Sequence, residues 1–298
     1  MWVSLAFLSA FFLGWYDISK KTALKDNAVI PVLFLNTLFC SLLLSPLLIL
    51  SKGGLIIEDS ILFVPDLNLE EHFFVFIKSV IVLTSWIFGF FAIKHLPLSI
   101  VGPINATRPV MSLVGAFLIF NERLNLYQWI GVLLTVASIF LLSSSSKKEG
   151  INFKKNKWMI YLFLATVLGA ASGLYDKHLM LKMSSTAVQF WFNTYQCILM
   201  VLIMLLIWYP TRKTTTSFKW RWSILAISLF ITIADFIYFY ALTDPSAMIS
   251  IVSMIRRSSV IISFAGAAIL FRESNLKGKA IDLILIIVGM FFLYLGTK

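Results

Sequence analysis

The sequence Gly-Trp-Tyr-Asp at residues 14–17 recurs as Gly-Leu-Tyr-Asp at residues 173–176, which is 159 positions further along the chain. In the same order, Asn-Thr-x-x-Cys at residues 36–40 recurs at residues 193–197, which is 157 positions further along. Both pairs lie in long apolar stretches, and their separations nearly agree. Such internal similarity indicates that the chain is built from two related halves of about equal length.

A third pair supports the same division. Gly-x-x-x-x-Phe-x-Glu at residues 115–122 recurs at residues 266–273, which is 151 positions further along. Three matches in one order and at similar separations are difficult to explain by chance. We therefore predict a first half at residues 1–145 and a second half at residues 158–298. The linker between them, at residues 146–157, contains five lysines.

The composition assigns this chain to the membrane. Of its 298 residues, 59% are hydrophobic and 13% are charged, whereas soluble domains contain roughly 45–50% apolar and about 25% charged residues. A soluble fold could not bury so much apolar surface, so we expect the lipid bilayer to be the main partner. The net charge of +11 does not indicate a nucleic-acid partner, because most basic residues lie in short connectors between apolar stretches.

Apolar stretches of about 17–25 residues are long enough to cross a bilayer as helices. They predict ten transmembrane helices, and therefore an all-α polytopic membrane protein, at residues 2–19, 29–50, 73–93, 97–120, 126–145, 158–178, 186–209, 222–242, 246–271 and 280–296. Because five spans per half is an odd number, the second half must cross the bilayer in the opposite direction. Two inverted five-helix repeats, with a substrate site between them near the midplane, are typical of secondary transporters.

Lysine and arginine lie mainly in every second connector. The odd-numbered connectors hold 16 of them, whereas the even-numbered connectors and the C-terminal tail hold 5. Positively charged connectors stay in the cytoplasm, so we predict that both termini lie outside. The bias reverses between the halves, since connectors two and four carry 2 basic residues and their counterparts seven and nine carry 7. An inverted second copy requires this reversal.

Three arginines lie near the middle of predicted spans, Arg108 in the fourth and Arg256 and Arg257 in the ninth. An arginine at the centre of a membrane helix costs about 2.5–3.5 kcal/mol on insertion scales. These side chains must therefore face a wet cavity, a carboxylate or an anionic substrate. Pro109, together with the Gly-Pro pair at residues 102–103, predicts that the fourth helix kinks or breaks beside Arg108.

Asp235, in the middle of the eighth span, is a candidate counter-charge, and Tyr238 lies three residues further on the same helical face. A static pair between Asp235 and an arginine of the ninth span is one possibility, and a substrate-binding role for both residues is the other. Arg256 and Arg257 point about 100° apart, so one of them should meet substrate while the other meets Asp235 or the bundle. In either case the central arginines outnumber the central aspartate, which predicts an anionic substrate.

Further candidate substrate-binding residues recur between the halves. Tyr16 and Tyr175 could line a cavity or pack between helices. Asn36 and Asn193 could bind substrate or form hydrogen bonds between helices.

Charged residues toward the ends of spans have other expected roles. Asp17 and Asp176 are repeat-related and are candidates for coupling or gating. Lys78 lies about six residues inside its predicted span, so we expect it to extend to the membrane surface. Glu122 and Glu273 end the fourth and ninth spans, where a gate or a helix cap is expected.

The end of the fourth span resembles the EamA type of the drug/metabolite transporter superfamily. The resemblance rests on the five-plus-five spans, Pro109, Gly115, Asn-Glu-Arg-Leu at residues 121–124 and Gly131 in the next span. The second half departs from it, because residues 272–275 read Arg-Glu-Ser-Asn. The resemblance implies a secondary active transporter that works by alternating access. Members of that family carry amino acids, nucleotide sugars, sugar phosphates or drugs.

A narrower resemblance concerns the ninth span. Residues 255–263, Ile-Arg-Arg-Ser-Ser-Val-Ile-Ile-Ser, are similar to the ninth span of plastid phosphate translocators, in which a basic dyad and a basic residue of the fourth span hold the substrate phosphate. Arg108 lies in the equivalent span, although it stands beside the proline and not a turn earlier. The resemblance implies an organic anion with a phosphoryl or carboxylate group.

Two alternatives share this fold, an exporter of amino acids or drugs that uses the aspartates, and a flippase for a lipid phosphate. We do not expect an enzyme, because the sequence has no nucleophile–base constellation and no phosphate-binding loop. We expect no metal and no cofactor. The expected location is the bacterial cytoplasmic (inner) membrane, as a monomer or a homodimer.

Overall fold

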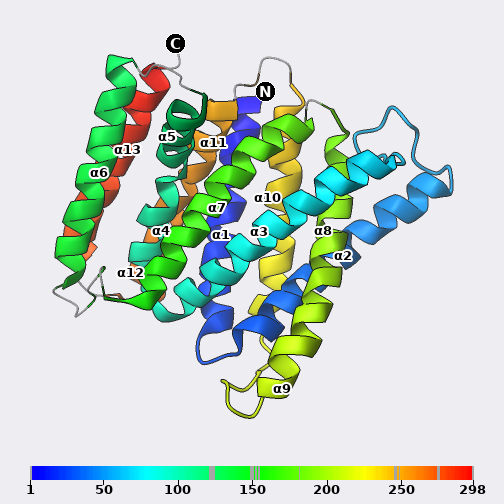
Figure 1. Cartoon of the computed structure of the whole chain (residues 1–298), viewed down its shortest axis with the longest axis horizontal. Coiled ribbons are helices and arrows are strands. Elements are labelled where there is room, and N and C mark those ends of the chain that lie inside the picture. Colours follow the sequence, from blue (N-terminus) through cyan, green and yellow to red (C-terminus); the bar gives the residue numbers. More distant parts are fainter. Residues whose placement is uncertain are drawn as a thin grey trace.

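The computed structural model consists of helices joined by connectors, of which those at residues 53–68 and 212–222 are the longest in its described part (Figure 1). It describes the backbone of the chain except residues 1, 121–124, 148–150, 152, 154, 181, 245–246, 248, 274–275 and 297–298, and it leaves undescribed the side chains of residues 115–120, 177 and 249–250. Within the described residues, every regular element is helical. An all-helical membrane fold was predicted, and the structure confirms it.

The first half contains six helices, because its fourth span is broken into two. They are α1 (Trp2–Leu24), α2 (Val29–Lys52), α3 (Leu69–His95), α4 (Leu98–Ala106), α5 (Arg108–Phe120) and α6 (Leu126–Lys147). The largest differences from the predicted spans are at the end of α1 and the start of α3, which extend further than hydropathy indicated.

The second half repeats the pattern. Its helices are α7 (Lys157–Met180), α8 (Ser185–Ile203), the π-helical turn η1 (Met204–Trp208), the short α9 (Tyr209–Thr211), α10 (Ser223–Leu242), α11 (Ile249–Arg257), α12 (Ser259–Ile269) and α13 (Leu276–Leu295). In the described part of the chain, nine helical stretches are long and apolar enough to cross a membrane. The pair α4–α5 occupies the remaining predicted span.

The two broken spans are interrupted at equivalent positions of the repeat. Thr107 separates α4 from α5, and Ser258, 151 positions later, separates α11 from α12. At each break the backbone N–H bonds to the carbonyl three residues earlier, at Ile104 (3.1 Å) and Ile255 (2.9 Å). Pro109 follows the first break, as predicted. The second break has no proline, and the sequence did not predict it.

The broken spans lie close against other helices because small residues face the contacts. A Cβ atom on Gly102 of α4 would lie 2.8 Å from Val260 of α12, and one on Gly14 of α1 would lie 2.5 Å from Ile262 of the same helix. Close packing over small residues is the usual way in which membrane helices associate. Helices α4, α12 and α1 therefore form a tight group across the two halves.

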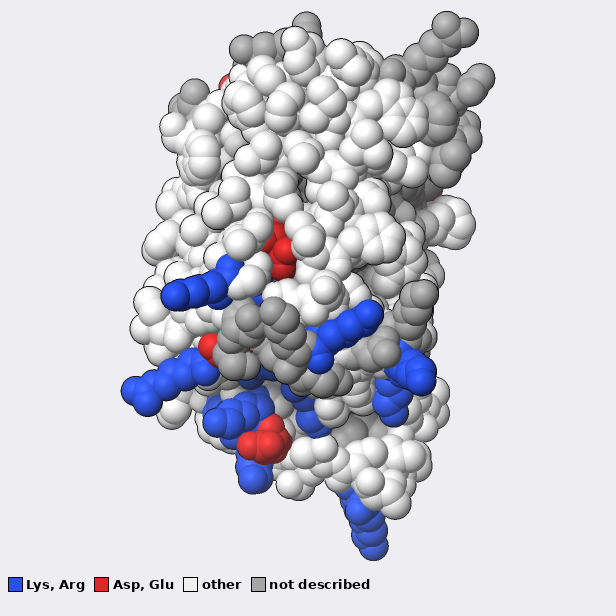
Figure 2. Space-filling view, turned by 90° about the vertical axis from the view of Figure 1, so that its left-hand side faces the viewer, with Lys and Arg blue, Asp and Glu red and all other residues white. Residues whose placement is uncertain are grey.

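The first residues of α1 and the last residues of α13 lie at the same end of the helical bundle, which is the upper end in Figure 1. Exposed basic residues lie in the connectors and at the first residues of helices at the opposite end, among them Lys155, Lys157 and Lys277. Figure 2 shows lysine and arginine gathered over the lower part of one face, whereas most of the upper part is uncharged. This distribution agrees with the charge bias of the connectors.

Candidate functional site

A cavity of about 150 Å³ lies between the two halves. Its lining comes from α1, α3, α4 and α5 of the first half, and from α7, α8, α10, α11 and α12 of the second. Cavities of about this volume hold a benzene-sized molecule. The site is therefore suited to a small ligand and is built jointly by both repeats.

The cavity lining is rich in charge for a membrane interior. Among the described lining residues, five carry positive charge, namely Lys20, Lys78, Arg108, Arg256 and Arg257, and three carry negative charge, namely Asp17, Asp176 and Asp235. Charged side chains at this depth are expensive unless they are paired or functional. The pairing of these eight groups therefore determines what the cavity can bind.

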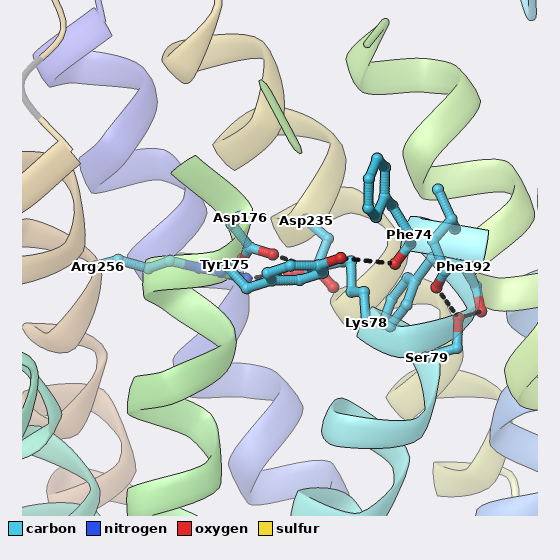
Figure 3. Close-up of polar contacts among 9 residues, drawn as sticks. Phe74, Lys78, Ser79, Tyr175, Asp176, Phe192, Asp235 and Arg256 are labelled. Carbon is cyan, nitrogen blue, oxygen red and sulfur yellow. Dashed lines mark hydrogen bonds and ion pairs between the residues drawn. The ribbon is translucent and has the colours of Figure 1, made fainter. Parts of the chain in front are cut away.

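Arg256 is paired with Asp235. Its guanidinium forms an ion pair with that carboxylate (Figure 3), and Cζ lies 4.2 Å from the centre of the Tyr238 ring. The contact adds a cation–π interaction to the ion pair. Of the two arrangements that the sequence left open, the structure has the pair between Asp235 and an arginine of the ninth span, and Arg256 is the arginine involved.

Lys78 forms a second pair, with Asp176 of α7 (Figure 3). Its side chain is 2% exposed, and Nζ lies 4.8 Å from the ring centre of Phe192 and 5.2 Å from that of Phe239. The expectation that Lys78 extends to the membrane surface is wrong. Helix α3 begins at Leu69, so Lys78 lies more than two turns inside it and faces the neighbouring helices.

Lys20 and Asp17 of α1 form the third pair, with 2.9 Å between Nζ and Oδ1. The hydroxyl of Ser263 donates to the other carboxylate oxygen at 3.3 Å, and Nζ of Lys20 lies 4.2 Å from the ring centre of Tyr16. The predicted first span ended at residue 19 and left Lys20 in the connector that follows, and this placement is wrong. The helix extends to Leu24 and places this lysine within the cavity.

Two arginines of the lining remain without a carboxylate partner among the described residues. Arg108 donates through Nη2 to Oδ1 of Asn105 at 3.1 Å, and its buried Nε has no hydrogen-bond partner there. The Nε of Arg257 is likewise buried without a partner in the described structure. With three acids neutralising three of the five cations, the described part of the lining has a net charge of +2.

Three of the predicted site residues lie outside this lining. Asn36 accepts a hydrogen bond from the hydroxyl of Ser228 at 3.2 Å, which connects α2 to α10. Asn193 donates to the carbonyl of Gln189 within α8. Tyr175 donates to the carbonyl of Phe74 at 3.3 Å (Figure 3). These side chains connect or stabilise helices around the cavity.

Sequence reasoning missed Lys20, Lys78, Asn105 and Gly169 as parts of the lining. A signal was present for the two lysines, because Lys20 directly follows the apolar stretch that contains Asp17, and Lys78 lies inside an apolar stretch. Asn105, three residues before Arg108, stood within reach of it on a helical face. A glycine in an apolar helix carries no such signal.

A contact between the halves lies at the start of α4, the helix that contributes Val101 and Gly102 to the cavity lining. The carboxylate of Glu273 accepts hydrogen bonds from the backbone N–H groups of Leu98 (2.6 Å) and Ser99 (2.9 Å), at the start of α4. The Ser99 hydroxyl also donates to it, and Lys279 donates to that hydroxyl at 3.0 Å. Glu273 therefore caps α4, one of the two roles expected of it. Glu122 lies outside the described residues.

The geometry of the turn after α12 explains how Glu273 reaches α4. The chain leaves α12 through Arg272, which has a left-handed backbone (φ 48°), and the N–H of Glu273 bonds back to the carbonyl of Ala267 at 3.1 Å. Left-handed residues commonly end helices in this way. The turn directs the carboxylate toward the first half, about one turn beyond Val101 and Gly102 of the cavity lining.

Comparison with known proteins agrees with the two-half architecture. The family model of the EamA-like transporter family matches residues 1–144 and again residues 156–295. No curated protein sequence matches the chain. One crystal structure, described only as that of a protein, has a TM-score of 0.64 and 17% sequence identity, and the match covers 98% of this chain and 96% of that chain. That likeness shows the fold alone.

The family's unit thus occurs twice, over nearly the whole chain, in a helical protein whose halves enclose a charged cavity. This chain belongs to the EamA-like transporter family, within the drug/metabolite transporter superfamily.

Proposed function

We propose that this transporter carries small organic anions with two negative charges, phosphorylated or dicarboxylic, by alternating access. The observation that supports the proposal is the pair Arg108 and Arg257, which have no carboxylate partner in the described part of a cavity where three other cations are paired. A bound dianion would neutralise the lining. The planar guanidinium groups suit phosphate and carboxylate, which they bind through two parallel hydrogen bonds.

Each half would contribute one substrate-binding arginine. Arg108 belongs to α5 of the first half, and Arg257 belongs to α11 of the second. Arg256 is already held by Asp235 and the Tyr238 ring, so Arg257 is the better candidate of the dyad. A substrate held between the halves can be exposed to either side as they move, which is how inverted repeats work in transporters.

A cationic amino acid or drug is less compatible with this cavity. Each of its aspartates, Asp17, Asp176 and Asp235, already faces a lysine or an arginine. A cationic substrate would have to displace one of these partners and would add charge to a lining that is already positive. A lipid phosphate shares the chemistry of the proposed substrate. A carrier of soluble anions would transport a water-soluble dianion, whereas a flippase would move only the lipid.

We further propose that the end carrying the basic connectors faces the cytoplasm of a bacterial inner membrane, with both termini outside. The support is the gathering of lysine and arginine at that end (Figure 2) and the positive-inside rule. Protease cleavage of tags at both termini from outside spheroplasts, whose outer membrane has been opened, would agree with this orientation. Protection of both tags would contradict it.

The test is uptake into vesicles reconstituted with purified protein. The probes are labelled succinate and glycerol 3-phosphate as dianions, lactate as a monoanion, arginine as a cation and a fluorescent phosphatidic acid as a lipid phosphate. We expect dianion uptake that falls at least ~30-fold in Arg108→Ala and in Arg257→Ala, because each loses a charged hydrogen bond to the substrate. Arg272→Ala, at an exposed arginine outside the cavity, is the matched control. Wild-type dianion uptake by both cavity variants, or uptake of the cation alone, would refute the proposal.

A further inference from the structure

The guanidinium of Arg108 lies directly on a glycine of the other half. A Cβ atom on Gly169 of α7 would be 2.6 Å from Cζ of Arg108, 2.7 Å from Nη1 and 2.8 Å from Nε. Such distances are shorter than any ordinary van der Waals contact, so a side chain of any size at residue 169 would collide with this guanidinium. The place that a side chain would occupy at this position is filled by Arg108.

The three nearly equal distances show how the group is oriented. They place the flat face of the guanidinium across the Gly169 backbone, with three of its atoms almost equally far from the missing Cβ. The N–H groups of arginine lie in the plane of the guanidinium, so stacking on the face leaves them available at the edge. Nη2 bonds to Asn105, and Nε has no partner among the described residues.

Lack of space for a side chain, and not the backbone conformation, explains why residue 169 is a glycine. Gly169 lies within the regular helix α7 and has no left-handed backbone angle, and a glycine in a helix costs about 1 kcal/mol relative to alanine. Gly173, one turn further on the same helix, also lines the cavity, but a Cβ atom there would meet no described atom within 4 Å. The close contact is therefore a property of residue 169.

We infer that Gly169 is a positioning residue for substrate binding. By lacking a side chain, it forms a slot in α7 that holds the Arg108 guanidinium with its free edge toward the cavity. Gly169 itself does not contact substrate, and its effect passes through Arg108. The inference rests on the proposed function for the identity of the ligand, because the slot matters to transport through the anion that Arg108 binds.

A double-mutant cycle tests the slot in the unliganded protein. Gly169→Ala should lower Tm by about 2–4 °C, because a methyl group is forced into a filled site. The same substitution in an Arg108→Ala background should have no such effect, since the colliding group is gone. Gly173→Ala is the matched control and should not lower Tm in either background. An equal effect of Gly169→Ala in both backgrounds would show that the two residues do not interact and would overturn the inference.

Transport tests the positioning role. With labelled succinate and glycerol 3-phosphate in reconstituted vesicles, Gly169→Ala should raise KM roughly tenfold with a smaller change in kcat, because a displaced guanidinium loses part of a charged hydrogen bond. Gly173→Ala should keep the wild-type KM. A general disturbance of helix packing would instead lower kcat in both variants.

The outcomes separate the two proposals. Coupling in the stability cycle together with an unchanged KM in Gly169→Ala would overturn the positioning role while the proposed function stands. Normal dianion transport by Arg108→Ala would overturn the proposed function, and with it the role of Gly169 in substrate binding. Both proposals would be supported if Gly169→Ala and Arg108→Ala are coupled in the stability cycle and if KM for the dianion rises in Gly169→Ala but not in Gly173→Ala.

Discussion

Lys78 and Asp176 pair in the cavity where neither side chain reaches bulk water, since 2% and 10% of their side-chain surfaces are exposed. Two aromatic rings cover the ammonium. In such a place the cost of an unpaired charge greatly exceeds the benefit of the pair, so the two residues depend on one another. Lys52 and Asp66, in contrast, form a pair outside the bundle with side chains that are 53% and 83% exposed.

We expect Lys78→Met or Asp176→Asn to lower the free energy of unfolding by about 3–5 kcal/mol, since each leaves one buried charge unpaired. The double variant should recover most of that loss. The corresponding changes at Lys52 and Asp66 should each cost less than ~1 kcal/mol. Denaturant titration in detergent micelles measures all of these values. Equal losses in the single and double variants would show that the charges do not depend on one another.

At the scale of residues, sequence alone identified the charged groups better than their partners. Arg108, Arg256 and Arg257 could be found because arginine is rare at the centre of an apolar span. The choice between Arg256 and Arg257 could not be made, because it depends on how far the helix is rotated about its axis. Tyr175 and Asn193 lie outside the lining for the same reason.

The broken spans are the elements on which the site is built. α4–α5 and α11–α12 break at equivalent residues, Thr107 and Ser258, and the cavity arginines lie directly beside these breaks. Sequence predicted the first break from its prolines. The second has neither proline nor glycine, and its signal was the repeat itself, because position 258 corresponds to position 107. Helix propensity alone could not have found it.

Glu273 provides a prediction at this scale, because it caps the broken helix α4 from the other half. Glu273→Ala should leave the N–H groups of Leu98 and Ser99 without their acceptor, a loss of about 1–3 kcal/mol, and should loosen the contact between the halves beside the cavity. In a background without Cys40 and Cys197, the readout is the labelling rate of Val101→Cys, in the cavity lining, by a membrane-impermeant thiol reagent added at the end where α12 terminates.

We expect labelling to be roughly tenfold faster when Glu273 is absent, in line with a loss of about 1.4 kcal/mol from the closed state. Arg272→Ala, the neighbouring residue, should label at the rate of the parent protein. An unchanged rate in Glu273→Ala would show that this contact does not restrict access to the cavity.

At the scale of the whole molecule, the architecture was the most predictable feature. Apolar stretches, an odd number of spans per half and a reversing charge bias suffice to predict two inverted five-helix repeats. The cavity was not predictable to the same degree. Its residues are contributed by helices distant in sequence, such as α1 and α11, and hydropathy does not distinguish a face that meets lipid from one that meets another helix.

Arg108 and Arg257, which have no carboxylate partner among the described residues, have a consequence for how the protein responds to the membrane potential. Each elementary charge moved across 100 mV changes the free energy by about 2.3 kcal/mol. An empty carrier with a cavity charge of +2 is sensitive to that field while it changes conformation, whereas a carrier loaded with a dianion is electrically neutral at its centre. Exchange of one dianion for another should therefore be independent of voltage.

A potassium gradient with valinomycin, applied to vesicles exchanging succinate, would measure this. We expect the exchange rate to stay constant as the potential is varied, and net uptake, which requires the empty carrier to return, to change with it. Exchange of the monoanion lactate should depend on voltage, because the loaded cavity retains one positive charge. If dianion exchange followed the potential as steeply as net uptake, the cavity charge would not be balanced by its cargo. The number of charges that this protein leaves unpaired would thus set which of its transport modes a cell can drive electrically.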